Sequence, residues 1–408
     1  MKCLVNATRV AGLTGNLVPY HHARWQAFAQ ISGASCLMVE LTNKDEFSVL
    51  EISQTERSDY ERTTLFPQNL PSKLSPAKIS RAVARALDQK RPSCVCLNGY
   101  ASPLALGALD WCLCNQVPAI MMSESTAWDE PRKGWKEWLK SRVIRLCPSA
   151  LVGGSPHADY MAQLGMPRER IFLGYDAVDN DYFELNTKKI RSRDLEIRKV
   201  HGLPENYFLA SARFTPKKNL PRLVEAYAQY RKLCSSGIVP RDLVILGDGD
   251  GREALLALQS KLSLEKNVHL VGAKSYKDLP IYYGLASAFI HASTTEQWGL
   301  VVNEAMASGL PILVSNRCGC VPDLVREGVN GFTFDPYQVE DIAQKMLQLS
   351  TFESQHSTFG RASGEIIAKW SPQRFAEGLS KAIKVALSSP LPRSTWFNRA
   401  LLWVLLHR

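Results

Sequence analysis

Long hydrophobic runs are missing from this sequence of 408 residues. A membrane-spanning helix needs roughly 18 consecutive apolar residues, and the nearest candidate, residues 400–406, is far shorter. Residues 1–6 are too short, and too soon followed by polar residues, for a secretory signal. We therefore expect a cytoplasmic protein, with peripheral contact to the inner face of the membrane left open.

Paired-cysteine and nucleic-acid signatures are also missing. The ten cysteines include no Cys-x-x-Cys, which favours reduced, buried thiols over a disulfide framework or a zinc site. The formal net charge of +10 favours an anionic partner: a nucleotide, a phospholipid surface or a nucleic acid. No basic tail or aromatic RNA-reading motif selects nucleic acid, so we expect none.

What the sequence does contain is alternation of short apolar runs with helical patterns, which predicts βαβ units and parallel sheets. The length predicts two domains. Predicted strands lie at 2–6, 35–41, 93–97, 119–122, 150–152 and 171–173, then at 207–212, 243–246, 268–270, 288–291, 312–314 and 331–334. Predicted helices lie at 20–31, 76–88, 103–115, 135–146 and 155–164, then at 219–233, 252–262, 277–285, 299–308 and 339–349.

The two halves meet at an acidic, turn-rich segment, residues 176–183, which a charged stretch follows to residue 201. We interpret these residues as a linker. The predicted organisation is an N-terminal Rossmann-like domain over 1–178, a C-terminal one over 179–372, and a helical tail over 373–408 that crosses back to the first domain. Two facing domains of this class would share a cleft at the carboxyl ends of their strands.

Two carboxylates, Glu296 and Glu304, stand eight positions apart around the predicted start of a helix at Gly299. The helix would direct backbone N–H groups, including those of Gly299 and Leu300, and the positive end of its dipole at an anionic phosphate. Glu304 lies deep enough in the helix to accept hydrogen bonds from a ribose. On spacing alone, a solvated loop acid and an ordinary helix acid explain the pair equally well.

Two cations follow the first strand of the second half. Arg213 and Lys218 flank a proline turn before a helix, where both can converge on a diphosphate. At the corresponding place in the first half, Gly12 and Gly15 form a predicted turn after the strand at 2–6, where the backbone could approach phosphate or sugar. The glycine-rich residues 247–251 lack a Walker ending, and we interpret them mainly as a tight turn.

Taken together, these motifs resemble the family 4 glycosyltransferases, enzymes with the GT-B fold of two Rossmann-like domains. The resemblance rests on Arg213 with 218–219, on 246–249, on 271–272, on the acid pair with 304–311, and on 328–332. It covers residues 205–335 specifically and the first half only by layout and by Gly12 and Gly15.

The resemblance implies a retaining transferase with a nucleotide-diphosphate sugar as donor and a hydroxyl of a glycan, a lipid-linked molecule or a secondary metabolite as acceptor. Arg213 and Lys218 would hold the diphosphate, Glu304 the ribose and Glu296 the transferred sugar. Gly272 and Lys274 would lie against the nucleobase. No metal or other cofactor is expected. A GT-B epimerase, a phosphorylase or a non-catalytic sugar-nucleotide-binding protein stays open.

The first half departs from that family. Relatives often carry a histidine in a late loop, where this sequence offers Glu124, followed by Asp129 and Arg132. Glu124 is our candidate for contact with the acceptor or the sugar, and a helix-capping acid is the alternative. His21 and His22 would face the same region. Near the family's Gly-x-Asn-Gly turn, 319–320 and Asp323 replace the usual Gly-Gly and Glu, so the contacts to the sugar can differ.

A basic helix with two tryptophans is predicted over residues 132–145. Such a helix can lie on an anionic membrane surface, which would suit a lipid-linked acceptor. A helix that packs both tryptophans inward has the same sequence pattern. The tail over 396–408 could add a second amphipathic contact or cover the N-terminal domain.

Overall fold

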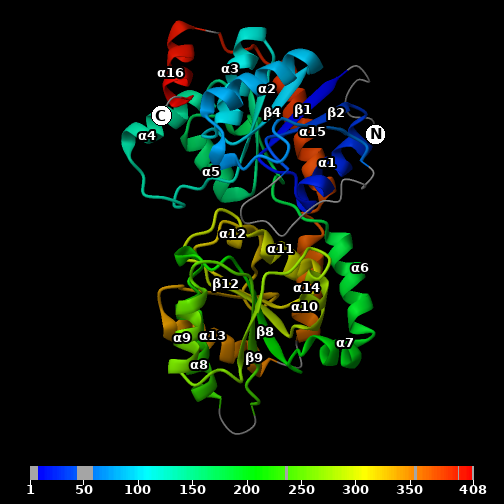
Figure 1. Cartoon of the computed structure of the whole chain (residues 1–408), viewed down its shortest axis with the longest axis vertical. Helices are drawn as coiled ribbons and strands as arrows, with labels where there is room; N and C mark the ends of the chain where they lie inside the picture. The colour runs from blue at the N-terminus through cyan, green and yellow to red at the C-terminus, as the bar shows by residue number, and fades with distance from the viewer. Residues whose placement is uncertain (1–7, 44–57, 235–237, 353–355, 394, 407–408) are drawn as a thin grey trace. The chain divides into compact units, whose positions relative to one another are not determined.

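The structure is a computed structural model that describes residues 8–43, 58–234, 238–352, 356–393 and 395–406. By its internal contacts the chain divides into two compact units (Figure 1). Unit 1 consists of Met1–Val178 with Trp370–Arg408, and unit 2 of Asp179–Lys369. The last helices of the chain thus belong with its beginning.

Unit 1 is built on a seven-stranded sheet in the order β3-β2-β1-β4-β5-β6-β7, in which every pair is parallel. Its strands are β1 (Arg9–Thr14), β2 (Ser35–Glu40), β3 (Glu61–Thr64), β4 (Cys94–Asn98), β5 (Ala119–Ser123), β6 (Ser149–Val152) and β7 (Ile171–Leu173). Its α-helices are α1 (Pro19–Ser32), α2 (Pro76–Lys90), α3 (Pro103–Asn115), α4 (Gly134–Ile144), α5 (Ser155–Gln163), α15 (Pro372–Ser388) and α16 (Trp396–Leu406). In Figure 1, α15 lies beside α1, and α16 lies beside α3.

Unit 2 has a six-stranded parallel sheet in the order β10-β9-β8-β11-β12-β13. Its strands are β8 (Tyr207–Ser211), β9 (Asp242–Leu246), β10 (Val268–Gly272), β11 (Ala288–His291), β12 (Ile312–Ser315) and β13 (Gly331–Phe334). Its α-helices are α6 (Asn180–Arg191), α7 (Asp194–His201), α8 (Leu220–Leu233), α9 (Arg252–Lys261), α10 (Leu279–Leu285), α11 (Leu300–Ala307), α12 (Val321–Leu324), α13 (Val339–Thr351) and α14 (His356–Ile367). Short 3₁₀ turns lie at Pro71–Lys73, Arg168–Arg170 and Pro216–Lys218.

Both sheets have the strand order of doubly wound folds, with the order reversing beside the first strand of each unit. In such sheets ligands bind at the carboxyl ends of the strands, where the order reverses. The central strands are buried on both faces, which explains their nearly continuous apolar runs, whereas the edge strand β3 is polar and partly exposed. The predicted α/β class with two doubly wound parallel sheets is confirmed.

The start of unit 1 differs from the prediction. The strand predicted at 2–6 lies outside the described residues, and the first described strand, β1, contains Gly12, which we expected in a turn. A Cβ atom on Gly12 would lie 2.1 Å from the indole of Trp25, so this glycine makes room for α1 against the sheet. Only Gly15 lies in the loop that follows the strand.

The segment predicted as a linker is largely helical. It forms α6 and α7, both of which belong to unit 2. Side-chain pairs four residues apart, such as Glu184 with Lys188 at 2.5 Å, link successive turns. Phe183, on the inner face of α6, is completely buried, and Arg191 donates to the carbonyl of Ser308 at 2.5 Å. The charged residues of this segment therefore indicate helices on the surface of unit 2, not a linker between domains.

Candidate functional site

The candidate site of unit 2 lies where β8 and β11 end side by side. The loop after β8 carries Arg213 and Lys218, and the loop after β11 carries Glu296. The two loops are joined by the backbone N–H of Thr294, which donates to the carbonyl of Lys217 at 2.9 Å. This is the place at which the strand order of the sheet reverses.

Asn219 holds this junction together. Its backbone has a φ of 58°, in the left-handed region that asparagine tolerates. Its buried side-chain amide donates to the carbonyls of Ala292 at 3.1 Å and Pro336 at 2.7 Å. One side chain thus connects the loops that follow β8, β11 and β13, and it fixes the direction in which Lys218 leaves the backbone.

Lys218 and Glu296 form an ion pair, with side chains that are 12% and 14% exposed. Glu296 also accepts from Ser293 at 3.3 Å and lies 3.3 Å from Nε2 of the buried His291. Burial alone would raise the pKa of Glu296, but the hydrogen bond from His291 and the charge of Lys218 hold it well below its ordinary value. Burial lowers the pKa of His291, so the neutral ring donates to an ionised carboxylate.

Arg213 lies in the same loop as Lys218 and is exposed to solvent. The glycine-rich turn after β9 supports this loop, because the backbone N–H of Phe214 donates to the carbonyl of Asp248 at 2.8 Å. A Cβ on Gly247 would lie 1.8 Å from the carbonyl oxygen of Ala212. The structure thus agrees with the interpretation of residues 247–251 as a tight turn, and it shows that the turn buttresses the loop of Arg213.

Gly299 stands directly before α11 with a φ of 108°, a conformation that favours glycine. Leu300 is the first residue of the helix. The first turn of α11 therefore follows the loop of Glu296 at the same edge of the sheet, as predicted. Its N–H groups and the helix dipole favour an anion there.

Glu304 lies one turn further, and the structure does not bring it to the Lys218–Glu296 pair. Its carboxylate is buried, 6% exposed, and accepts from the hydroxyl of Tyr283 at 2.7 Å. Burial raises the pKa of Glu304 to about 7. Gly272 ends β10 with a φ of 79°, and the ammonium of Lys274, two residues on, lies 5.4 Å from the ring centroid of Tyr282.

In unit 1, Glu124 follows β5 and lies close enough to the fully buried Asp176 to affect its pKa. Arg24, 1% exposed, lies 3.6 Å from the Asp176 carboxylate and donates from Nε to the carbonyl of Ala177 at 2.8 Å. Burial, together with the neighbouring Glu124, raises the pKa of Asp176 well above its ordinary value. The Asp176 carboxyl group thus lies between a buried guanidinium and a second acid.

The histidines of α1 have separate partners. Nδ1 of His21 lies 3.0 Å from the carbonyl oxygen of Asn16, and burial, aided by the charge of Arg24, lowers its pKa to about 3. Nδ1 of His22 lies 2.7 Å from the hydroxyl of Tyr60. His21 is therefore neutral and ties α1 to the loop that contains Gly15.

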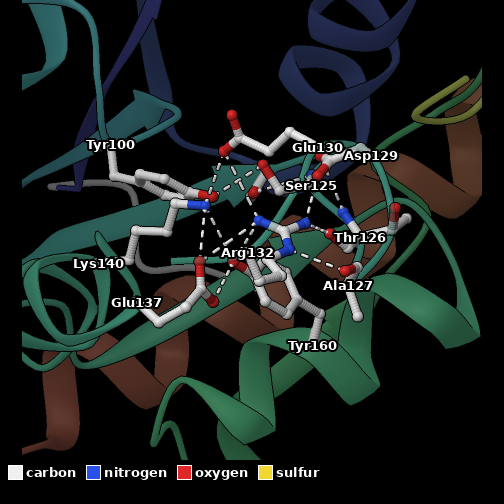
Figure 2. Close-up of polar contacts among 11 residues, drawn as sticks. Tyr100, Ser125, Thr126, Ala127, Asp129, Glu130, Arg132, Glu137, Lys140 and Tyr160 are labelled. Carbon is white, nitrogen blue, oxygen red and sulfur yellow. Dashed lines mark hydrogen bonds and ion pairs between the residues drawn. The ribbon is translucent and has the colours of Figure 1, made fainter. Parts of the chain in front are cut away.

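A second polar cluster of unit 1 surrounds Arg132 and Lys140 (Figure 2). Nζ of Lys140 lies 3.0 Å from Glu130 and 3.1 Å from Glu137. The hydroxyl of Tyr160 donates to Glu137 at 2.7 Å and accepts from both Arg132, at 2.8 Å, and Lys140, at 3.1 Å. These contacts fasten the loop after β5 to α4 and α5, so Arg132 serves the fold of this loop.

Comparison with known proteins finds one family that resembles part of the chain. Residues 194–365 match the family described as glycosyl transferases group 1. This part of the chain is therefore similar to that family. Among curated proteins of similar sequence, sulfoquinovosyl transferase SQD2 of Arabidopsis thaliana is 29% identical over 231 residues, which is 56% of this chain and 41% of that protein. Alpha-monoglucosyldiacylglycerol synthase of Acholeplasma laidlawii is 33% identical over 137 residues, a third (33%) of each chain.

The chain therefore matches less than half the length of these two relatives. A solved structure extends the likeness to the whole fold: Anabaena HepE in complex with UDP and glucose aligns with a TM-score of 0.68 at 17% identity, covering 92% of this chain and 99% of that one. The group 1 match falls in unit 2, where Lys218, Glu296 and the start of α11 meet. The fold predicted from the resemblance is that of GT-B glycosyltransferases, as the comparison confirms.

Some residues of this site were missed from sequence. From sequence, His291 is only the last residue of a predicted strand and Ser293 is not singled out, although two polar residues shortly before Glu296 at a strand end were a usable signal. Asn219 was quoted as part of a motif without its bridging role. Asp176 was assigned to the linker, and its burial against Arg24 depends on residues 152 positions apart in the sequence, which no local pattern reveals.

Proposed function

We propose that this protein is a retaining glycosyltransferase that moves a sugar from a nucleotide-diphosphate donor to a hydroxyl of an acceptor. The observation that carries the proposal is the convergence of Lys218, Glu296 and the first turn of α11 at the switch point of unit 2. A cation, a helix N-terminus and an acid at one strand edge suit a diphosphate flanked by hydroxyl groups.

In this proposal Arg213 and Lys218 bind the donor diphosphate and stabilise the charge that develops on the departing nucleotide. The exposed guanidinium can engage two phosphate oxygens at once, whereas the ammonium acts as a point charge. Because Glu296 holds Lys218 in the absence of donor, binding must move the ammonium from the carboxylate to the phosphate. Glu296 is then released to accept hydrogen bonds from hydroxyls of the transferred sugar.

Glu304 is assigned to the ribose, and Gly272 and Lys274 to the nucleobase. The carboxyl of Glu304 must turn from Tyr283 or be reached beside it, because it is almost completely buried. The two side-chain cations and the helix dipole supply the positive charge that the diphosphate needs, so the proposal requires no metal or other cofactor. The complex of Anabaena HepE with UDP and glucose makes UDP-glucose the first donor to try.

On the acceptor side, we assign Glu124 a contact with the acceptor or the transferred sugar, and Gly15 a backbone contact in the neighbouring loop. Glu124 is the partly exposed member of the pair with Asp176. Its carboxyl group can therefore accept a hydrogen bond from an incoming hydroxyl. One of the relatives is named as an alpha-monoglucosyldiacylglycerol synthase, which favours a lipid acceptor over a soluble glycan.

We further propose a cytoplasmic protein that contacts the inner face of a membrane through residues 132–145. Trp135 and Trp138 of α4 are 54% and 52% exposed, so they are not packed inward. Lys133 and Lys136 lie on the same short stretch, and such a surface suits anionic lipid headgroups. Among the residues that the structure describes, no helix combines the length and apolarity required for crossing a bilayer.

The experiment is a donor panel. The protein is incubated with UDP-, GDP- and ADP-sugars, and nucleotide release is measured with and without a membrane lipid extract. Slow release from one donor, accelerated by lipid and accompanied by a glycolipid of matching mass, is expected. A donor that is bound without any release would favour the non-catalytic alternative, release of an epimerised sugar nucleotide would favour an epimerase, and release that depends on phosphate would favour a phosphorylase.

A further inference from the structure

Unit 1 contains a cavity whose lining includes none of the residues assigned to the donor or to the acceptor. It has a volume of about 360 Å³, within the roughly 300–1,000 Å³ typical of small-molecule sites. It is lined from the β4–α3 loop, from the first residues of α2 and α3, from α4 and from the end of α16. Since α2 and α3 begin at the carboxyl edge of the sheet, the cavity lies at the edge where doubly wound folds bind ligands.

One part of its lining is hydrocarbon. Leu106 of α3, Leu139 and Val143 of α4, and Leu405 and Leu406 of α16 all contribute. Leu106 and Val143 are each 2% exposed and belong to the core of unit 1. An apolar lining that opens to the surface stabilises a ligand by removing hydrocarbon from water.

The other part is polar, and its charges are already balanced. Tyr100, Glu130 and Lys140 line it, and they belong to the cluster of Figure 2, in which Lys140 is paired with Glu130 and Glu137. The hydroxyl of Tyr100 donates to Ser125 at 2.9 Å. Paired ions of this kind offer hydrogen bonds to hydroxyl groups, whereas a second full charge would break an existing pair.

The rim carries groups that suit a membrane surface. Lys136 lines the cavity, and its ammonium lies 5.9 Å from the ring centroid of Trp135. On the α16 side, Trp403 is 61% exposed. The guanidinium of Arg142 lies 4.9 Å from the ring of Phe397 and so joins α4 to α16. An aromatic and basic rim around an apolar cavity is suited to taking a chain out of a bilayer.

We propose that this cavity binds one hydrocarbon chain of a lipid acceptor whose head carries uncharged hydroxyl groups, with the head at Tyr100 and Lys140. The inference rests on the proposed transferase function and narrows its acceptor to an amphiphile. It also gives α16 a role, because Leu405 and Leu406 close one side of the cavity.

The test uses 1-decanoylglycerol, below the concentration at which it aggregates, titrated calorimetrically into the full chain. Two variants reduce the cavity: Ala101→Trp, at an exposed position of its lining, and Leu139→Trp, at a half-buried one. The control is Gln89→Trp, which adds the same ring at an exposed position near the far end of α2. This end is about 20 Å from the first residue, Pro76, at 1.5 Å per residue.

We expect one equivalent to bind to the unmodified protein and to Gln89→Trp, and at least a tenfold weaker affinity in both cavity variants. Glycerol alone should not bind, and decanoate should bind at least tenfold more weakly than its glycerol ester. Equal binding by all variants, or none by the unmodified protein, would overturn the cavity. Equal binding of decanoate and 1-decanoylglycerol would overturn the assignment of an uncharged head.

UDP binding and donor release are measured on the same preparations. If both are normal while 1-decanoylglycerol does not bind, the cavity proposal fails and the transferase function stands. If no sugar nucleotide binds or reacts although 1-decanoylglycerol does bind, the transferase function fails, and with it the role of the cavity as an acceptor subsite.

Discussion

The two units share a strand order but use charge at the carboxyl edge of their sheets in different ways. In unit 2, Arg213 is exposed, and the side chains of Lys218 and Glu296 are 12% and 14% exposed. In unit 1, Arg24 and Asp176 are 1% and 0% exposed. The charged side chains of unit 2 can exchange their contacts for contacts with a ligand. Arg24 and Asp176 of unit 1 are buried and contact the protein itself.

This difference teaches that a doubly wound sheet supplies a place for a ligand but not the ligand's chemistry. Unit 2 places partly exposed charged side chains where its strand order reverses, and these can bind a diphosphate. Unit 1 neutralises its own charges and leaves a largely apolar cavity. Four predictions can break or sharpen the contrast, and they are ordered from the largest expected effect to the smallest.

Arg24→Ala should have the largest effect, on stability. Removing one member of a buried pair leaves the other without compensation, which costs about 3–5 kcal/mol of unfolding free energy. Thermal unfolding measures this loss of stability. Arg168→Ala is the matched control, because Arg168 pairs with Asp159 at 67% and 56% exposure, and such pairs contribute about 1 kcal/mol or less. Equal shifts of the melting temperature in both variants would contradict the claim that the buried pair of unit 1 stabilises the fold more than an exposed pair does.

Lys218→Ala and Arg213→Ala should each lower the rate of sugar transfer by a factor of about 10² or more, as for the loss of one group that stabilises developing charge. Steady-state turnover with the active donor measures this. Lys217→Ala is the control, since Lys217 is an exposed neighbour that takes part only through its backbone carbonyl. Turnover that is unchanged in both variants would contradict the site.

Glu296→Gln should lower turnover by about tenfold or more, because the amide cannot replace the carboxylate at the sugar. It should not weaken UDP binding, because the amide no longer holds Lys218 in an ion pair. Glu304→Ala should chiefly raise the donor's KM. Both are read from full kinetics with a UDP titration alongside. The opposite division of effects would mean that the two acids have exchanged roles.

The last prediction concerns how stability and UDP affinity depend on pH. Folding raises the pKa of Glu304 from 4.5 to about 7, so the stability it contributes is fully present below about pH 4.5 and is lost as the pH rises toward 7. If the ionised carboxylate binds the ribose, UDP affinity should also rise across this interval. Calorimetry at several pH values checks both trends, and Glu304→Gln should flatten each of them relative to the unmodified protein. A slope that is identical in the variant would assign the titration to another group.

Much of the fold could be predicted from sequence because its signals are local. Buried parallel strands are continuous apolar runs, and the motif residues of unit 2 follow them directly. The errors have physical causes as well. Gly12 was placed in a turn because the need for space beside Trp25 is set by a helix packed on the strand. The prediction of a linker over residues 184–201 is wrong because a helix on the surface of a unit has charged residues on most of its circumference. Its sequence therefore resembles that of a charged linker.

The sequence predicts the positions of site residues only where these residues follow the end of a strand or precede the start of a helix. Lys218 and Glu296 are 78 residues apart in sequence, yet their strands, β8 and β11, are neighbours in the sheet. The pairing of Glu124 with Asp176, and the bond from Tyr283 to Glu304, depend on side-chain packing between distant segments. No spacing rule contains that information, so the residues could be proposed but their partners could not.

The most direct measurement is a crystal structure of the protein with UDP. The account predicts the β-phosphate within hydrogen-bonding distance of Arg213 and Lys218, next to the first turn of α11, with the Lys218–Glu296 pair opened. Phosphates bound elsewhere, with that pair still intact, would contradict it.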